Sequence, residues 1–299
     1  MKTLIVGFGS IGSQHYEALN EILNPEEIYI YSRRNLEIDN CINTLEGLSF
    51  DQFDYIVLSN ESSLHKEWLR KIENVDSKIL VEKPLFSKKT LDVGFKNKKN
   101  IYVGYFLRIH PLIEYLKQIN NIKIQKVEFI NHSWLPDWRS NIDYQKSVSA
   151  KRNLGGGVLN ELSHDLDLAK FLFGEYEMTD HTLKISEELK LDVYDSFKGE
   201  SVTKKDEIKI EFSLSMAVKK IEKYIKIYTK DNIYTADFIN NTYSSGKEIK
   251  SINNKKSLKK TLLKAQHQMI LNNDVNDLSN FDDGLWLVNL IDEIQKEYA

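Results

Sequence analysis

The stretch KTLIVGFGSIGSQH, residues 2–15, passes from a short β-branched apolar run directly into a Gly-x-Gly-x-x-Gly turn and then into a helical pattern. In a dinucleotide-binding fold, the first glycine makes the tight turn, the second lets the backbone approach a pyrophosphate, and the third lets helix and strand pack closely. The pyrophosphate then lies at the helix N-terminus. Taken alone, the motif fits an ordinary glycine-rich turn equally well. Its candidate cofactor-binding residues are Gly7, Gly9, Ser10, Ile11 and Gly12.

The rest of the first hundred residues repeats this alternation of strand and helix. Further buried strands, with helical stretches between several of them, are predicted at residues 27–32, 54–59, 78–85 and 100–106. Strands that alternate with helices form a parallel, doubly wound sheet. The sequence therefore predicts an α/β fold, and this context favours a dinucleotide site over an ordinary turn.

Length and charge limit the classes of partner. The chain has 299 residues, enough for two domains and a sizeable buried site. Lysine plus arginine number 41 against 44 for aspartate plus glutamate, so the net charge of −3 favours neither nucleic acid nor an anionic membrane. The single cysteine, Cys41, cannot form an internal disulfide, and we expect no signal peptide and no membrane span. A cytoplasmic protein that binds small molecules is the expectation.

The end of the second strand bears on the choice of nicotinamide cofactor. An acidic residue there hydrogen-bonds the ribose 2′-hydroxyl of NAD and repels the 2′-phosphate of NADP. Here the strand ends in Ser32, Arg33 and Arg34, a hydroxyl and two guanidiniums that suit a phosphate. The sequence predicts NADP as the preferred cofactor and NAD as the other possibility. The alternative is that the arginines are two solvated loop charges.

Further stretches occur in the order found in one family of oxidoreductases. They are VLSNESSLHKEW (57–68), VEKPL (81–85), VGYFLRIHP (103–111), GGGVLNELSHDLD (155–167) and FDDGLWLVNLIDEIQK (281–296). Together with the glycine motif, these stretches resemble the Gfo/Idh/MocA oxidoreductases, the superfamily of glucose-fructose oxidoreductase and inositol dehydrogenase. The motifs are fairly specific for the family and not specific for a substrate.

The resemblance implies two domains. A Rossmann NAD(P)-binding domain would cover residues 1–110, and a substrate-binding and oligomerisation domain residues 111–299. The second domain would be α+β, with an open, mainly antiparallel sheet that carries the substrate pocket and often the interface of a homodimer or homotetramer. Candidate cofactor-binding residues outside the glycine motif are Ser32, Arg33, Arg34, Asn60, His65, Glu82 and Lys83. A surface histidine at a helix N-terminus explains His65 almost as well.

The resemblance also implies catalytic residues. In the family, the lysine of the Glu-Lys-Pro motif reaches the reacting hydroxyl and the nicotinamide ribose, so this role passes to Lys83. An Asp-x-x-x-His pair on a helix of the second domain completes the site. This chain instead has Glu161, His164 and Asp165, a longer acid and one residue fewer in the spacing. Which of the three residues inherits each role stays open.

On an α-helix, Glu161, His164 and Asp165 share one face, and apolar residues cover the other. We therefore expect these side chains at the rim or floor of a pocket, where a carboxylate beside a histidine suits acid–base catalysis. The alternative is a histidine held by capping carboxylates for stability. Asp167 points away from this face and is expected to be structural. The three glycines ahead would admit cofactor or substrate close to the backbone.

Residues 131–157 form a predicted long, aperiodic loop, which in a compact domain is usually functional. Its tryptophans suit stacking on a sugar, and its cations suit a carboxylate or phosphate. Equally, the loop fits an arm packed on the sheet or on a neighbouring subunit. Residues 240–268 are predicted to form a surface hairpin or a mobile excursion. The candidate substrate-binding residues are Arg108, Trp138, Arg139, Lys151, Arg152 and Asp165.

These observations predict an NAD(P)-dependent oxidoreductase that transfers hydride between nicotinamide and the CH–OH group of a sugar or sugar-derived alcohol, or the corresponding ketone. Lys83, His164 and Glu161 would be catalytic, and no metal is expected. An acidic substrate from a surface-glycan pathway is a further expectation. The alternative is a catalytically silent NADP-binding sensor, which would have no use for these three residues.

Overall fold

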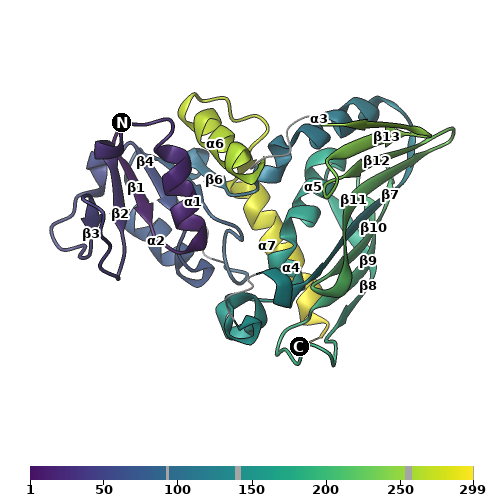
Figure 1. Ribbon diagram of the computed structural model, residues 1–299, viewed down its shortest axis with the longest axis horizontal. Coiled ribbons are helices and arrows are strands. Elements are labelled where there is room, and N and C mark those ends of the chain that lie inside the picture. Colours follow the sequence, from purple (N-terminus) through teal and green to yellow (C-terminus); the bar gives the residue numbers. More distant parts are fainter. Residues whose placement is uncertain (92–93, 139–142, 253–257, 299) are drawn as a thin grey trace. The chain divides into compact units, whose positions relative to one another are not determined.

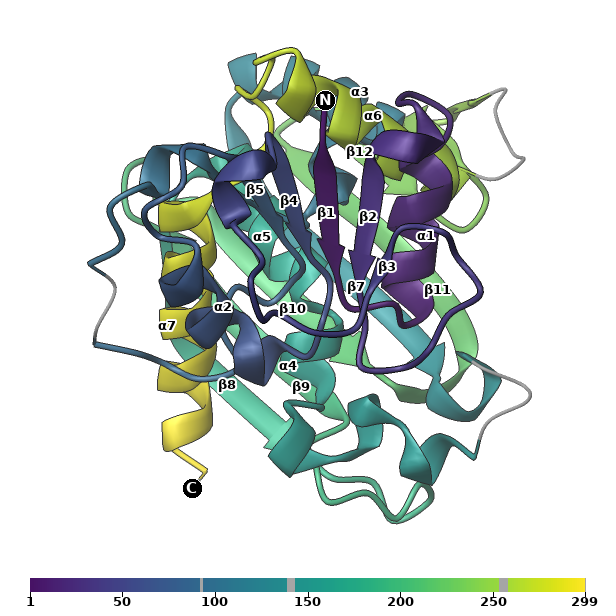
Figure 2. The ribbon, with the colours of Figure 1, turned by 90° about the vertical axis from the view of Figure 1, so that its left-hand side faces the viewer.

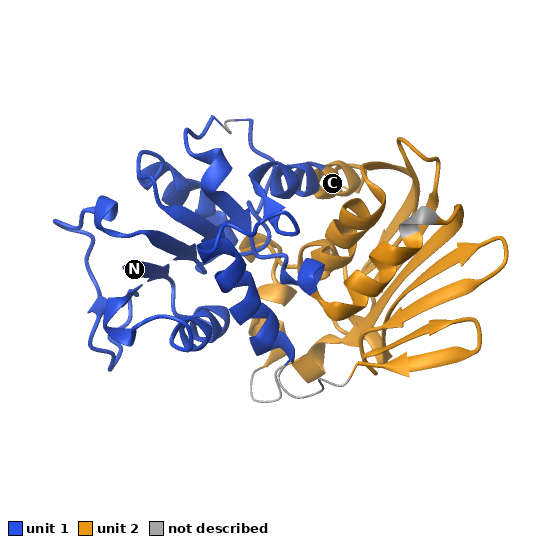
Figure 3. Cartoon of the chain, turned by 90° about the horizontal axis from the view of Figure 1, so that it is seen from above, with its two compact units in different colours: residues 1–109, 256–289 blue, residues 110–255, 290–299 orange. Residues whose placement is uncertain are grey.

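The computed structural model describes residues 1–91, 94–138, 143–252 and 258–298. The chain divides into two compact units, which comprise residues 1–109 with 256–289, and residues 110–255 with 290–299 (Figure 3). The single boundary predicted after residue 110 is therefore incomplete, because residues 256–289 return to the first unit.

The first unit is built on a sheet whose described strands follow the order β15-β6-β5-β4-β1-β2-β3 (Figures 1 and 2). All neighbouring strands are parallel except β15, which pairs antiparallel with β6. The predicted parallel sheet is confirmed. The strands are β1 Thr3–Val6, β2 Ile28–Tyr31, β3 Cys41–Ile42, β4 Tyr55–Leu58, β5 Lys78–Val81, β6 Ile101–Val103 and β15 Ser279–Asn280. The helices are α1 Ser10–Leu19, α2 His65–Lys71, α6 Leu258–Leu271 and the start of α7 Phe281–Lys296.

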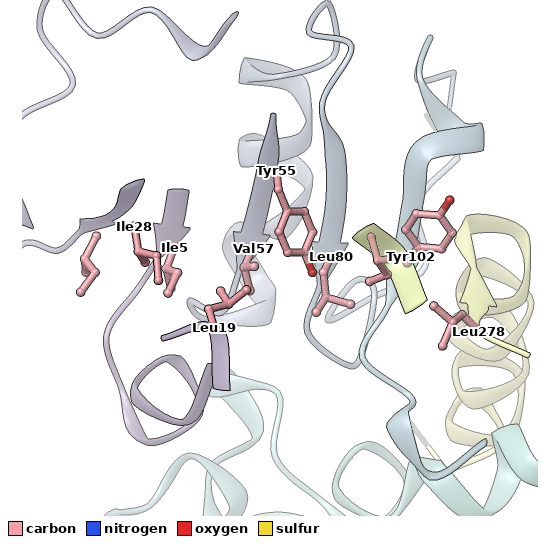
Figure 4. Close-up of a cluster of buried hydrophobic side chains, with 10 residues drawn as sticks. Ile5, Leu19, Ile28, Tyr55, Val57, Leu80, Tyr102 and Leu278 are labelled. Atoms are coloured by element: carbon pink, nitrogen blue, oxygen red, sulfur yellow. The ribbon is translucent and has the colours of Figure 1, made fainter. Parts of the chain in front are cut away.

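Apolar side chains from neighbouring strands hold this unit together. Ile5, Val57 and Leu80 lie on adjacent strands, and Leu19 of α1 packs against them (Figure 4). All four are fully buried, and buried apolar surface stabilises a fold by about 25 cal/mol per Å². Parallel strands are covered on both faces, so they read as continuous apolar runs in the sequence. The same arrangement brings the carboxyl ends of these strands to one edge, where such sheets bind ligands.

The second unit contains a sheet of the order β14-β13-β12-β11-β7-β10-β9-β8 in the described residues (Figure 1). Only β7 and β10 pair in parallel, so the predicted mainly antiparallel sheet is confirmed. The strands are β7 Ile124–Trp134, β8 Tyr176–Lys184, β9 Ser196–Thr203, β10 Lys209–Ser215, β11 Ala217–Thr229, β12 Ile233–Asp237, β13 Thr242–Ser245 and β14 Glu248–Ser251. The helices are α3 Pro111–Lys117, α4 Val158–Glu161 and α5 Ser163–Phe173.

One face of this second sheet packs on α5. The rings of Phe129 and Phe173 lie 6.4 Å apart, and the hydroxyl of Tyr176 donates to the carbonyl of Leu166 at 3.1 Å. The segment 240–268 was predicted as a surface hairpin or mobile excursion. Its described residues include the hairpin of β13 and β14 and the first part of α6, whereas residues 253–257 lie outside the described residues. Among the described helices, none combines the length and the apolar character that crossing a bilayer requires.

Candidate functional site

The glycine turn lies between β1 and α1. Gly7 has a φ of +91°, and a Cβ atom there would lie 2.8 Å from Cα of Asn60. A Cβ at Gly12 would lie 2.3 Å from the carbonyl oxygen of Gly7, so only glycine lets helix and strand pack this closely. Gly9 caps α1, and a Cβ there would meet no protein atom within 4 Å. The turn therefore leaves the N-terminus of α1 open to an anion.

Asn60 is the second element of this edge, directly beyond β4. Both polar atoms of its side-chain amide are buried and have no hydrogen-bond partner among the described residues. A buried polar group without a partner costs about 1–3 kcal/mol, which points to a ligand that completes it. An amide next to the glycine turn, at the carboxyl ends of parallel strands, fits a bound dinucleotide.

The segment after β2 holds the residues predicted to select the cofactor. Ser32 is buried, and its hydroxyl accepts the N–H of Arg34 at 3.1 Å. The guanidinium of Arg34 donates to the carbonyl of Phe8 in the glycine turn. The Nη2 of Arg33 lies 2.7 Å from Oε1 of Glu61. The two arginines thus lie on the predicted edge, each with a protein partner.

The turn after β5 carries Glu82 and Lys83. Glu82 was predicted to bind cofactor, but it is buried and points into the protein. One of its oxygens lies 3.0 Å from Nε2 of His15, and the other accepts the N–H of Lys83 at 3.2 Å. A Cβ at Gly104 would lie 2.7 Å from the Glu82 carboxylate, so that glycine makes room for it. Glu82 therefore holds the turn that presents the half-buried Lys83.

A hydrogen-bonded chain continues inward from Glu82. Nδ1 of His15 lies 3.0 Å from Nε2 of His267, and Nδ1 of His267 lies 2.9 Å from the hydroxyl of Tyr55. His15, His267 and Tyr55 are fully buried. The neighbouring His15 holds the pKa of Glu82 below its usual value despite the opposing effect of burial, whereas burial takes the pKa of His267 well below its usual value. Sequence analysis missed this chain, although His15 follows the glycine motif directly.

His65 does not lie on the surface, whereas its contact with a cofactor stays a prediction. It is fully buried at the start of α2. Its Nδ1 lies 3.1 Å from the carbonyl oxygen of Pro84, and its Nε2 lies 3.2 Å from that of Asn60. Burial lowers the pKa of the ring. His65 therefore ties the turn after β4 to the turn after β5.

Arg108, predicted as a substrate ligand, forms a buried ion pair within the first unit. Its side chain is buried, and Nη1 lies 2.9 Å from Oδ2 of Asp283. Asp283 lies in the first turn of α7. A buried ion pair of this kind is lost at high cost if one partner is removed, so Arg108 anchors α7 to the first unit.

In the second unit, the predicted continuous helix is interrupted at Leu162. Glu161 ends α4, whereas His164 and Asp165 lie in the first turn of α5. The shared face that regular helical spacing predicts is therefore divided between two short helices. Glu161 and His164 are half-buried, while Asp165 is fully buried.

Asp165 was predicted to bind substrate, and in the structure its carboxylate has two protein partners. Its Oδ2 accepts the side-chain N–H of Asn131 at 2.7 Å and lies 4.0 Å from Nζ of Lys223. Burial raises the pKa of Asp165, against the opposing charge of Lys223. Burial, with a contribution from Lys223, lowers the pKa of His110 to about 4. Asn131 and Lys223 were missed because they lie on β7 and β11, far from the helix in sequence.

The three glycines before α4 serve the protein's own backbone. A Cβ at Gly156 would lie 2.3 Å from the carbonyl oxygen of Val148 and 2.5 Å from that of Ser149. Gly157, with a φ of +109°, caps α4. At Gly156, the group that lies close to the backbone is therefore the segment Val148–Ser149 of the protein, where a cofactor or substrate was predicted.

The predicted loop 131–157 is more regular than expected. It begins as the end of β7 and then forms short 3-10 turns that include Leu135–Trp138 and Arg152–Leu154. Trp138 is exposed and Lys151 is half-buried. Arg152, predicted to bind substrate, donates from Nε to the carbonyl of Asp192 at 3.1 Å, which is a structural contact. Arg139 lies outside the described residues.

Within the described part of the chain, no group of three histidine, cysteine, aspartate or glutamate side chains is placed to hold a metal ion. The structure brings together the predicted cofactor residues of the first unit around the ends of β1, β2, β4 and β5. The candidate catalytic residues Glu161 and His164 lie in the second unit, and Lys83 lies in the first.

No protein-family model matches the chain, and no curated protein sequence matches it. Solved structures share its fold. The UDP-N-acetylglucosamine 3-dehydrogenase GnnA from Acidithiobacillus ferrooxidans is 17% identical, with a TM-score of 0.74 over 97% of this chain and 94% of that chain. The WlbA dehydrogenase from Bordetella pertussis, solved with NADH and UDP-GlcNAcA, is 15% identical, with a TM-score of 0.75 over 99% and 95%.

A mutant of KijD10, a 3-ketoreductase from Actinomadura kijaniata solved with TDP-benzene and NADP, is 14% identical, with a TM-score of 0.75 over 99% and 97% of the two chains. At sequence identities this low, structural similarity establishes that the fold is shared and nothing more. By its fold, this chain is similar over nearly its whole length to these two dehydrogenases and this ketoreductase.

Proposed function

We propose that this protein is an NADP-preferring oxidoreductase that acts on a sugar or sugar-derived alcohol or ketone. The observation that carries the proposal lies at the carboxyl ends of the parallel strands in the first unit. There, an open helix N-terminus behind a glycine turn lies beside the buried amide of Asn60, which has no partner among the described residues. The fold is shared with enzymes solved with NADH or NADP.

In this proposal, the turn built by Gly7 and Gly12 admits the pyrophosphate at Gly9, Asn60 contacts the cofactor beyond β4, and Arg33 binds the 2′-phosphate. The nicotinamide supplies hydride transfer to or from the substrate carbon. Lys83 donates to the substrate oxygen and relays its proton. His164 acts as the partner acid or base, and Glu161 orients it. These catalytic roles rest on the family resemblance.

The test combines binding with turnover. Fluorescence titration should show NADPH binding to the wild-type protein. Neutral and acidic nucleotide sugars, with UDP-N-acetylglucosamine and UDP-GlcNAcA as the first pair, would be incubated with NADP while NADPH absorbance is followed. These two probes differ by a carboxylate, so their ratio tests the expected acidic substrate. Faster turnover of the acidic probe supports a substrate from a surface-glycan pathway.

Two substitutions test the catalytic assignment. Lys83→Ala and His164→Ala should each lower turnover by at least about a hundredfold, as for the loss of a positioned acid or base, with cofactor affinity nearly unchanged. Lys88→Ala is the matched control, because Lys88 is exposed in the segment after the same turn. Near-normal turnover in both variants would remove the assignment. NADPH binding with no turnover of any sugar would favour the sensor.

Assembly and location form a further part of the proposal. We infer a cytoplasmic homodimer or homotetramer from the family resemblance, in which the open sheet of the second unit often forms the interface. Light scattering coupled to size-exclusion chromatography measures the mass directly. A monomer at micromolar concentration would contradict this part and leave the proposed activity untouched.

A further inference from the structure

Arg33, a predicted ligand of the 2′-phosphate, is paired with a carboxylate of the same unit. Its Nη2 lies 2.7 Å from Oε1 of Glu61. Glu61 directly follows Asn60, at the carboxyl end of β4, so the pair joins the segment after β2 to the segment after β4. The side chains are 73% and 49% exposed. Exposed ion pairs contribute little to stability, so Arg33 can exchange its partner easily.

Arg34 is held in a different way. Its guanidinium donates to the carbonyl of Phe8 inside the glycine turn, and its N–H donates to the hydroxyl of Ser32. The side-chain amide of Asn43 donates to the carbonyls of Ser32 and Arg34 at 2.9 and 3.0 Å. These contacts fix the backbone after β2 and attach Arg34 to the turn. Arg33 is therefore the arginine of this segment whose partner an incoming phosphate would replace.

We propose that Glu61 determines cofactor specificity by competing with the 2′-phosphate of NADP(H) for Arg33. The inference rests on the proposed function, since it requires the adenosine end of the cofactor to lie beside the segment after β2. A phosphate monoester carries a charge of about −1.5 to −2 at neutral pH. Beside Glu61, it shares the attraction of Arg33 and meets a like charge. NAD(H) has a hydroxyl at this position and experiences neither effect.

The consequence is a smaller preference for NADP(H) than the two arginines alone predict. Removing the Glu61 charge should enlarge that preference, whereas removing Arg33 should abolish most of it. Because the pair is exposed, both effects should shrink as ionic strength rises. The preference for NADP(H) should therefore depend on both Arg33 and Glu61, and not only on the number of positive charges after β2.

The experiment measures the dissociation constants of NADPH and NADH by fluorescence titration, so it requires no substrate. Glu61→Gln keeps the size of the side chain and removes its charge. It should tighten NADPH binding about two- to fivefold, the factor expected for one exposed charge pair, and leave NADH unchanged. Arg33→Ala should weaken NADPH and leave NADH unchanged. In the double variant, the gain from Glu61→Gln should shrink to the part that comes from relief of the like charge beside the phosphate.

Glu67→Gln is the matched control. It removes the same charge from an ion pair with Lys71, at 2.7 Å on α2, and should not alter the ratio of the two affinities. The inference is overturned if both cofactors bind and Glu61→Gln leaves their ratio unchanged. It is also overturned if the gain is just as large without Arg33, or if Glu61→Gln weakens NADH. If neither cofactor binds the wild-type protein, the proposed function itself fails.

Discussion

At the scale of single residues, Gly9 differs from its neighbouring glycines in what surrounds it. Gly7 and Gly12 are required by the protein, because a Cβ at either would overlap backbone atoms at 2.8 Å or less. A Cβ at Gly9 would meet no protein atom within 4 Å. Under the proposed function, the requirement for glycine at this position comes from the bound pyrophosphate.

This difference separates binding from stability in a pair of variants. Gly9→Ala should change the free energy of unfolding by less than about 1 kcal/mol, yet weaken NADPH by about tenfold or more, because one extra carbon would intrude on the pyrophosphate. Gly12→Ala should destabilise the fold by about 1–3 kcal/mol through overpacking. Denaturant unfolding and NADPH titration check both. Unchanged NADPH affinity in Gly9→Ala would argue against a pyrophosphate at this turn.

At the scale of elements, α6 brings a late segment of the chain against α1 (Figure 1). Its His267 completes the chain of hydrogen bonds that starts at Glu82. The ionised Glu82 only accepts, so Nε2–H of His15 donates to it. Nδ1 of His15 then accepts from His267, whose own Nδ1 accepts from Tyr55. One set of tautomers satisfies every member, and buried networks of this kind stabilise a fold only when fully satisfied.

Replacing His267 should therefore lower the free energy of unfolding by more than the loss of its packing alone. His267→Leu leaves Nδ1 of His15 and the hydroxyl of Tyr55 without partners. Each such group costs about 1–3 kcal/mol, so we expect the free energy of unfolding to fall by about 2–6 kcal/mol. The exposed Gln268, next to it on α6, supplies the control Gln268→Ala. Equal stability of both variants in denaturant titrations would show that the network contributes little.

At the scale of the whole molecule, buried histidines link folding to pH. Burial lowers the pKa of His65 and His267, and burial with the charge of Lys223 lowers that of His110 to about 4. Their unfolded-state pKa is about 6.5. As pH falls below that value, these histidines bind protons in the unfolded chain but stay neutral in the folded chain. The stability held above about pH 6.5 is therefore lost on acidification.

The expected result is a steep loss of stability as pH falls from about 6.5 toward about 4, the folded-state pKa of His110. Each histidine whose pKa is lowered by folding adds up to about 1.4 kcal/mol per pH unit to the slope of the free energy of unfolding against pH. Urea unfolding at a series of pH values measures it. His110→Gln should reduce the slope by about one proton, because it removes one titrating group. A slope that is unchanged in this variant, or a free energy of unfolding that is flat across the range, would contradict this view.

The sequence by itself determined the local elements and the class of fold. Strand, glycine turn and helix were predictable because backbone sterics and apolar periodicity act over a few residues, and both sheets were confirmed in type. Only the tertiary structure decided which polar side chains are buried against protein partners. Glu82, His65 and Arg108 look like site residues in the sequence, yet each is buried against protein partners, and Arg108 pairs with Asp283, 175 positions away. Arg33 is separated from Glu61 by 28 positions. Hydrogen-bond and charge partners are chosen by proximity in space, and no local pattern encodes that proximity.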